Sequence, residues 1–307
     1  MTPRPPYAAA LLFTALVLFF VDFDSNYRWR LLKPLFDPAH ALYFGAVAIA
    51  LVHWQPALRT LSFWRQLIAI TLIAGSAGAF IELAQAPTSR SASLADIGRD
   101  LLGALAALVC FSPRRADIGR LPRQTLTIFA VAALLLVCYP AARDLLDAAI
   151  AAARFPVLAD FSTPFEADRW NRGVVVPSPA GDTSSALCVQ LTTERYSGAT
   201  MDRLNGDWRG YRLLHLRLYN EGPAPLPVTL KVFDLRHAAS QGDYHDRYNR
   251  VYQLAAGWNT VEVPLAEIER APRRRAMDLR RIAELSIFTV DLDAPRRLCI
   301  DDVRLTR

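Results

Sequence analysis

Polar side chains of three types used in acid–base chemistry lie at the ends of apolar segments in the N-terminal half of the chain. The candidate catalytic residues are His40, Glu82 and Asp96. A desolvated glutamate with a raised pKa beside a histidine is a usual arrangement for proton transfer. The sequence adds no nucleophile motif and no metal-ligand spacing to them. These residues could therefore move protons, but they define no reaction.

The three candidates belong to a larger polar group that converges at one membrane face, because the second and fourth apolar segments begin where the third ends. Asp37, His40 and Tyr43 have the spacing of one helix face. Ser93 and Asp96 predict a capping box at the start of the fourth helix. The whole membrane-face cluster is Asp37, His40, Tyr43, Glu82, Gln85, Arg90, Asp96 and Asp100.

Three interpretations of the membrane-face cluster stay open. It is a structural network in which Arg90 or Arg99 neutralises Glu82 or Asp96, a site for a polar head group, or a set of side chains exposed at the interface. Charged groups at this depth are costly and are usually paired or functional.

Five apolar segments predict the helices that would position this cluster. They cover residues 7–21, 40–54, 63–83, 94–111 and 125–139. With flanking residues, each approaches the length of roughly 20 residues that crosses a bilayer. The first runs into Asp22 and Asp24, which predicts a retained helix instead of a cleaved signal. The basic loop 114–123 favours a cytoplasmic N-terminus, which would put the C-terminal half outside the cytoplasm of a bacterial inner membrane.

Several motifs in this half resemble the VanZ-like membrane protein family over about residues 5–112. They are Asp37-Pro-Ala-His40-Ala-Leu-Tyr43, Gly78-Ala-Phe-Ile-Glu82-Leu-Ala-Gln85, Arg90-Ser-Ala-Ser93-Leu-Ala-Asp96 and Gly103. Where the family usually has Asn, this chain has Asp100, which adds charge and removes two donors. The resemblance implies a bacterial cell-envelope protein with a link to envelope or glycopeptide-antibiotic tolerance, without a settled activity.

Residues 155–307 follow another pattern, in which polar and apolar residues alternate in short runs separated by turn residues. Strands are predicted over residues 187–191, 214–219, 228–233, 260–263, 285–290 and 298–305. Without intervening helices, these runs predict an all-β sandwich. The chain is thus expected to be multi-domain, with a transmembrane helical domain (1–140), a linker or interfacial helix (141–154) and an extracytoplasmic sandwich (155–307).

The second half resembles the galactose-binding-like jelly-roll domains that include carbohydrate-binding modules. The motifs are Asp160-Phe161, then residues 207–211, 257–261, 264–265 and 300–305. The resemblance implies a binding module more than an enzyme. It also implies a possible structural calcium, for which Glu166, Asp301 and Asp302 are candidate ligands, unless these are plain surface acids.

A loop dense in polar and aromatic residues separates two of the predicted strands. Its candidate ligand-binding residues are Asp234, His237, Tyr244, His245, Asp246, Arg247 and Asn249. Aromatic rings can stack on a sugar while the polar groups bind its hydroxyls. The alternatives are an ordered loop held by pairs such as Arg247–Asp246, or a surface that docks on the membrane domain.

Cysteine, tryptophan and charge contribute three smaller predictions. Cys188 and Cys299 fall in strands that could neighbour one another, and a disulfide between them is left open. Trp170, Trp208 and Trp258 are interpreted as core or turn anchors. The net charge of +6 comes mainly from arginines that flank the apolar segments, so no nucleic-acid partner is expected.

Three functional hypotheses follow. The leading one is a bacterial envelope protein, held in the lipid bilayer, whose sandwich binds a glycan or a lipid-linked glycoconjugate. The second is a membrane enzyme that acts on a lipid-linked polar substrate through His40, Glu82 and Asp96. The third is a non-catalytic scaffold.

Overall fold

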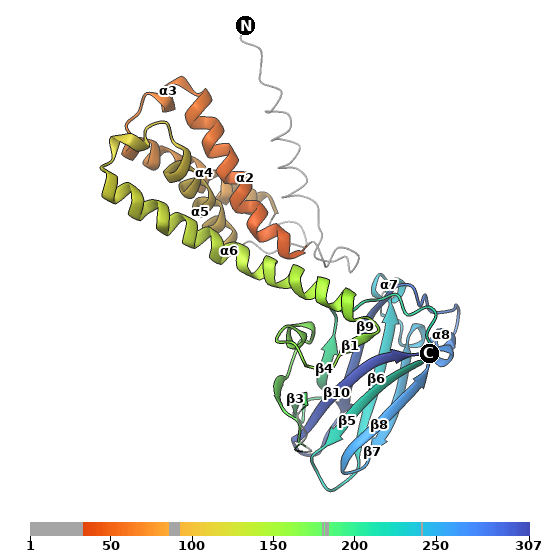
Figure 1. Ribbon diagram of the computed structural model, residues 1–307. Helices are drawn as coiled ribbons and strands as arrows, with labels where there is room; N and C mark the ends of the chain where they lie inside the picture. The colour runs from red at the N-terminus through yellow and green to blue at the C-terminus, as the bar shows by residue number, and fades with distance from the viewer. Residues whose placement is uncertain (1–32, 86–92, 180, 182–183, 241) are drawn as a thin grey trace. The chain divides into compact units, whose positions relative to one another are not determined.

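The computed structural model describes residues 33–307 apart from residues 86–92, 180, 182–183 and 241. The chain divides into two compact units, Met1–Leu145 and Leu146–Arg307. The described part of the first unit is helical, and the second unit holds the strands (Figure 1). The boundary between the two units falls inside one long helix, α6 (Arg120–Arg154). Residues 141–154 belong to this helix and are therefore helical. The predicted helix over residues 7–21 lies outside the described residues.

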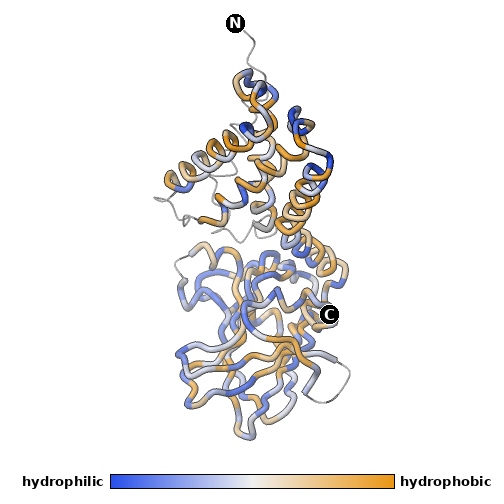
Figure 2. The backbone as a smooth tube through the Cα atoms, turned by 90° about the vertical axis from the view of Figure 1, so that its left-hand side faces the viewer, coloured by the Kyte–Doolittle hydropathy of each residue, from blue (hydrophilic) through white to orange (hydrophobic). Residues whose placement is uncertain are grey.

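Four of the predicted apolar helices are confirmed as helices. The elements before α6 are α2 (Lys33–Trp54), α3 (Pro56–Arg59), α4 (Phe63–Gln85), α5 (Leu94–Phe111) and the 3-10 turn η2 (Arg115–Asp117). Figure 2 shows these helices coloured mainly as hydrophobic. Among the described residues, Phe63–Ala84 and Arg120–Arg154 are long and apolar enough to cross a membrane. A bundle of five membrane-crossing helices therefore stays a prediction.

Helices α2 and α5 pack at backbone contact, because glycine occupies their crossing point. A Cβ atom added to Gly103 would lie 1.9 Å from the carbonyl oxygen of Ala41. A Cβ atom on Gly45 would lie 3.1 Å from the carbonyl oxygen of Gly103. Small residues allow helices to approach this closely.

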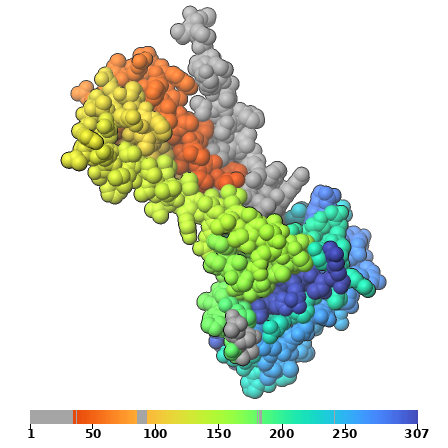
Figure 3. Space-filling view, viewed as in Figure 1, coloured from red at the N-terminus to blue at the C-terminus, as the bar shows by residue number. Residues whose placement is uncertain are grey.

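The unit Leu146–Arg307 is a β-sandwich of two antiparallel sheets. One sheet has the strand order β2-β3-β10-β5-β8, with β1 also paired to β10, and the other has the order β4-β9-β6-β7. Figure 3 shows β10 as a dark blue band across the visible face of the larger sheet. The strands are β1 (Val157–Ala159), β2 (Val174–Pro177), β3 (Ser185–Leu191), β4 (Tyr196–Met201), β5 (Leu213–Asn220), β6 (Leu226–Asp234), β7 (Tyr248–Leu254), β8 (Gly257–Pro264), β9 (Ile282–Val290) and β10 (Arg296–Thr306).

Short helical turns connect several of these strands. They are η3 (Glu166–Arg169), α7 (Leu235–Ala238), η4 (Tyr244–Asp246) and α8 (Leu265–Arg270). The six predicted strands are confirmed inside β3, β5, β6, β8, β9 and β10. Gly257 has a φ of 84°, as a turn requires, but Trp258 already pairs with Tyr219 in the sheet.

Alternate residues of the two sheets meet in one apolar core. Leu214, Leu216 and Leu218 of β5 are buried from one side, and Leu230 and Val232 of β6 from the other. Burial of each such side chain contributes roughly 1.5–3 kcal/mol. Two of the interpreted anchors also lie in the core, Trp170 and Trp208.

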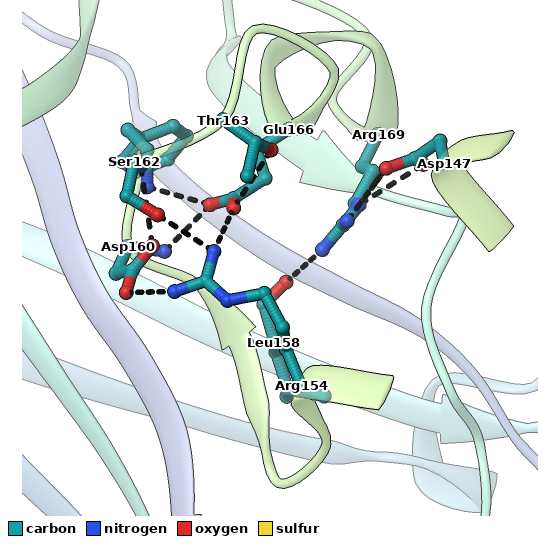
Figure 4. Close-up of polar contacts among 9 residues, drawn as sticks. Asp147, Arg154, Leu158, Asp160, Ser162, Thr163, Glu166 and Arg169 are labelled. Carbon is teal, nitrogen blue, oxygen red and sulfur yellow. Dashed lines mark hydrogen bonds and ion pairs between the residues drawn. The ribbon is translucent and has the colours of Figure 1, made fainter. Parts of the chain in front are cut away.

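The last turns of α6 are anchored to the sandwich by two arginines, Arg154 and Arg169, that bind three carboxylates (Figure 4). The Nη2 atom of Arg169 donates to Asp147 at 2.6 Å, and its Nη1 atom donates to the carbonyl oxygen of Leu158 in β1 at 2.6 Å. Arg154 donates to Glu166 at 2.7 Å and to Asp160 at 2.5 Å. We call these residues the anchor cluster: Asp147, Arg154, Asp160, Glu166 and Arg169.

Glu166 is the central acceptor of the anchor cluster and is almost completely buried, with 1% of its surface exposed. Its Oε2 atom accepts the backbone N–H groups of Asp160 at 2.7 Å and Phe161 at 2.6 Å. Its Oε1 atom accepts the Arg154 guanidinium and the hydroxyl of Thr163. A buried carboxylate needs this many donors to offset the loss of water.

The close approach of α2 and α5 predicts that Gly103→Ala will destabilise the helical unit, because the new methyl group would overlap the backbone of Ala41. Gly98→Ala on the same helix is the matched control, since nothing lies within 4 Å of its added Cβ. Thermal unfolding of the full-length protein in detergent measures both variants. An equal effect of the two substitutions would contradict the close packing.

The anchor cluster predicts that Arg169→Ala will lower the free energy of unfolding of the sandwich by about 3–5 kcal/mol, because it leaves the buried Asp147 carboxylate without its partner. Denaturant unfolding of the full-length protein, followed by tryptophan fluorescence, measures this loss. Arg209→Ala removes an exposed pair with Asp207 and should leave the unfolding midpoint nearly unchanged. Similar unfolding midpoints for the two variants would show that the Arg169–Asp147 contact stabilises the sandwich no more than an exposed ion pair does.

Candidate functional site

His40 and Asp100 form a buried contact inside the helical unit. Nδ1 of His40 lies 3.1 Å from Oδ1 of Asp100, and 6% and 2% of the two residues are exposed. Gly78 on α4 leaves the space for this carboxylate, because a Cβ atom there would lie 2.9 Å from Oδ2 of Asp100. Asp100 is therefore the partner of His40 within the helical unit.

The other two candidate catalytic residues have separate partners. Glu82 accepts the backbone N–H group of Ser93 at 2.6 Å, at the start of α5. Asp96 forms an ion pair with Arg99, three residues along the same helix. The predicted capping box is wrong, because the side chain of Ser93 makes no capping hydrogen bond and the carboxylate of Glu82 binds the N–H group of Ser93 instead. The helix start at Leu94 is confirmed.

The structure describes the membrane-face cluster only in part. Arg90 and the side chains of Asp37 and Gln85 lie outside the described residues. The ring of Tyr43 packs edge-on against Phe44. The described contacts agree with a structural network more than with one shared catalytic site, because His40, Glu82 and Asp96 each bind a different group.

Arg275 organises the acidic part of the predicted binding loop. Its guanidinium donates to Asp234 at 2.7 Å and to Asp246 at 2.6 Å. Asp234 is fully buried and also accepts the N–H groups of His237 at 3.0 Å and Asp278 at 2.8 Å. Burial alone would raise the pKa of Asp234, but the hydrogen bonds from Arg275 and the backbone outweigh it and lower that pKa. Hydrogen bonding to Arg275 likewise lowers the pKa of Asp246.

Three predicted ligand residues therefore have a structural role in this loop. Asp234 and Asp246 bind Arg275, and Nδ1 of His237 lies 3.5 Å from Oδ2 of Asp246. Burial lowers the pKa of His237, with a further contribution from nearby Arg247. The partner of Asp246 is thus Arg275, not the Arg247 named among the alternatives; Arg247, which precedes β7, lines a cavity with other residues.

The other four predicted ligand residues line a cavity of about 310 Å³ between the start of β7 and the end of α8. They are Tyr244, His245, Arg247 and Asn249. Both polar atoms of the Asn249 amide are buried without a hydrogen-bond partner, and so is Nε of Arg247. Native structures rarely leave such groups unsatisfied, so these atoms point to a missing partner such as a ligand or water.

A row of polar side chains crosses the outer face of the four-stranded sheet and ends at Asn249. The strand register places Thr200 opposite Ser286, Ser286 opposite Lys231, and Lys231 opposite Asn249. Their neighbours along the strands, such as Met201, Ile287 and Val232, point into the core. Because successive side chains alternate between faces, the four polar residues share the outer one. We call them the polar row.

Short hydrogen bonds connect three strands along the polar row. The Thr200 hydroxyl donates to Ser286 at 3.0 Å, and the Ser286 hydroxyl donates to Glu284 at 2.7 Å. Nζ of Lys231 lies 2.8 Å from Oε1 of the same glutamate. Tyr196 and Phe288 form an edge-on aromatic pair at one end of this face, with 58% of Tyr196 exposed. Thr200, Ser286 and Lys231 were not among the predicted ligand residues, although each occupies an outward position of its strand.

The candidate calcium ligands bind protein groups in the structure. Glu166 belongs to the anchor cluster. Asp301 lies 3.6 Å from Arg217, and Asp302 lies 3.3 Å from His215. The part of the chain that the structure describes contains no group of three or more His, Cys, Asp or Glu side chains arranged to hold a metal ion. The acids instead neutralise basic side chains of their own unit.

Cys188 and Cys299 form a disulfide between β3 and β10. The two residues lie directly opposite one another in the strand register. The same row continues through Tyr219 to Trp258, whose rings pack edge-on with centroids 5.2 Å apart. Trp258 is therefore an anchor on the outer face of the larger sheet, where it covers the disulfide region with Tyr219.

Comparison with known proteins found similar solved structures only. No family model matches the chain, so the VanZ-like resemblance gains no support there, and no curated protein matches it. One similar structure is a family 11 carbohydrate-binding module from Clostridium thermocellum in complex with a β-1,3-1,4-mixed-linked tetrasaccharide. It has a TM-score of 0.39 and 15% identity, over 49% of this chain and 94% of that chain.

Two further solved structures have similar scores. A family 28 module specific for non-crystalline cellulose has a TM-score of 0.34 and 11% identity, over 50% of this chain and 93% of that chain. The CBM22-1 and GH10 modules of Clostridium thermocellum xylanase 10B, complexed with xylohexaose, have a TM-score of 0.34 and 15% identity, over 49% of this chain and 28% of that chain. With TM-scores below 0.5, these likenesses assign no function to the chain.

The lowered pKa values of Asp234 and Asp246 predict an acid-sensitive sandwich. Since both folded-state pKa values lie below the ordinary value of about 3.9, the ion pairs stabilise fully above that pH and are lost as the pH falls through the folded values. Arg275→Met should therefore reduce the difference between the melting temperatures at pH 7 and pH 3. The neighbouring Arg274→Met should keep the wild-type difference; an unchanged difference in Arg275→Met would contradict the assignment.

Proposed function

We propose that the protein is a membrane-anchored glycan-binding protein of a bacterial envelope. The glycan, free or lipid-linked, binds on the outer face of the four-stranded sheet. The single observation that carries this proposal is the polar row ending at the unpartnered amide of Asn249. Sugar hydroxyls both donate and accept hydrogen bonds, and this face offers both kinds of group.

The chemistry of the face supports a sugar more than an apolar ligand. Glu284 is an acceptor, Lys231 is a donor, and the Asn249 amide supplies one of each. The aromatic pair of Tyr196 and Phe288 adds an apolar surface at one end. Sites that combine a few placed polar groups with aromatic rings are typical of small-molecule binding.

The location in the membrane is part of the proposal and rests on the helices. Phe63–Ala84 and Arg120–Arg154 have the length and composition of membrane spans. Large apolar side chains on them are exposed, with 71% of Phe80, 68% of Phe129 and 74% of Leu136 accessible. A bilayer would cover such surface, which a water-soluble protein rarely leaves open.

The disulfide supports an extracytoplasmic position of the sandwich. Disulfides persist in oxidising compartments and are rare in the cytosol. The Cys188–Cys299 bond therefore favours the orientation in which the N-terminus is cytoplasmic and residues 155–307 lie outside. The alternative of a membrane enzyme is not favoured by the described contacts, since His40, Glu82 and Asp96 bind separate partners.

Binding of the full-length protein in detergent to a panel of envelope polysaccharides tests this proposal. Tyr196→Ala, which removes the exposed ring of this face, and Asn249→Ala should each weaken binding about tenfold, which corresponds to about 1.4 kcal/mol. Thr260→Ala, an exposed position on the other sheet, is the matched control and should bind as the wild type does. No binding to any polysaccharide would reject the proposal, and a co-purifying protein in place of a glycan would favour the scaffold.

A further inference from the structure

The cavity beside Asn249 has an excess of positive charge. Arg247, Arg250 and Arg273 line it, and Glu267 is the acid on its wall. Glu267 is already paired with Arg250. Within the described residues, neither Arg247 nor Arg273 has an ion pair. Two guanidinium groups at one cavity are therefore left without a counter-charge from this part of the chain.

Arg247 is placed by its neighbours to meet a ligand. Its guanidinium lies over the ring of Tyr244, 5.0 Å from the centroid. Its Nε atom is buried and has no hydrogen-bond partner. An aromatic ring holds a guanidinium in a fixed plane, and a planar guanidinium recognises carboxylate or phosphate through paired hydrogen bonds.

The cavity is continuous with the polar row through one residue. Asn249 lines the cavity and also stands opposite Lys231 in the sheet. Its amide atoms are buried without a partner, so this residue can serve a ligand that reaches from the sheet face to the cavity. The ring of Tyr244, 61% of which is exposed, offers an apolar surface at the cavity.

We infer that this cavity binds the anionic group of an acidic sugar, a carboxylate or a phosphate carried on the ring. Arg247 and Arg273 supply the counter-charge, and Asn249 binds a neighbouring hydroxyl. The inference rests on the proposed glycan-binding function and deepens it by naming the class of sugar.

Titration of the full-length protein with glucuronate, followed by the fluorine resonance of 3-fluorotyrosine, tests the cavity directly. A saturable shift of the Tyr244 signal is expected, assigned by its loss in Tyr244→Phe. Arg247→Gln and Arg273→Gln should each weaken the titration at least tenfold. Arg274→Gln makes the same charge change in the same loop outside the cavity lining, and should leave it unaltered. No saturable shift with glucuronate or with glucose 6-phosphate overturns the inference.

Measuring the binding of polymers shows whether the inference or the proposed function has failed, because the two give different results. Oligogalacturonate, its methyl ester and a glycerol-phosphate polymer are compared by calorimetry. Preference for oligogalacturonate identifies the carboxylate as the source of charge, and preference for the phosphate polymer identifies phosphate; either supports the inference. If the neutral methyl ester binds as tightly as oligogalacturonate, and Arg247→Gln leaves that binding unchanged, the inference is overturned but the proposed function stands. A glucuronate shift without binding of any polymer keeps the cavity site and rejects the wider function.

Discussion

Two guanidinium groups, the buried one of Arg169 and the partly exposed one of Arg154, join the end of α6 to the first residues of the sandwich. Asp147 and Arg154 are seven residues apart on α6, so they share one face of the helix and meet their partners together. Arg169 contacts both the helix and β1, and Glu166 holds the chain turn at Phe161, where φ is 54°. A buried charge without its partner is strongly unfavourable, so these ion pairs and hydrogen bonds favour this position of the helix end over others.

The strand register likewise determines which side chains lie on the outer face of the smaller sheet. The alternation that buries Leu230, Val232 and Ile287 sends Lys231 and Ser286 outward, so core and polar row come from a single pairing. A slip by one residue would exchange the two faces and bury the lysine. Apolar packing therefore determines the positions of the polar groups, although it makes no contact with a ligand itself.

Local patterns predicted most of the elements, whereas partners distant in sequence could not be predicted. Helix α5 begins at Leu94 as expected, and six strands were located from alternation alone. Four strands were missed: β1 and β2 have only three and four residues, and β4 and β7 have polar sequences, such as Tyr248–Leu254, that carry little apolar alternation. Arg275 binds Asp234 across 41 residues, and Lys231 meets Glu284 only through strand pairing. The composition indicated a polar loop, but it could not show which of its residues already bind partners within the protein.

The disulfide joins β3 to β10, the last strand of the sandwich. The sequence separation of Cys188 and Cys299 is 111 residues, and most of the sheet strands lie between them. A protease that cuts an exposed loop in this interval would divide the backbone but leave both fragments covalently linked. The strand pairing on either side of the cut could then hold the fragments in register. A single cleavage in that interval would therefore not release a fragment.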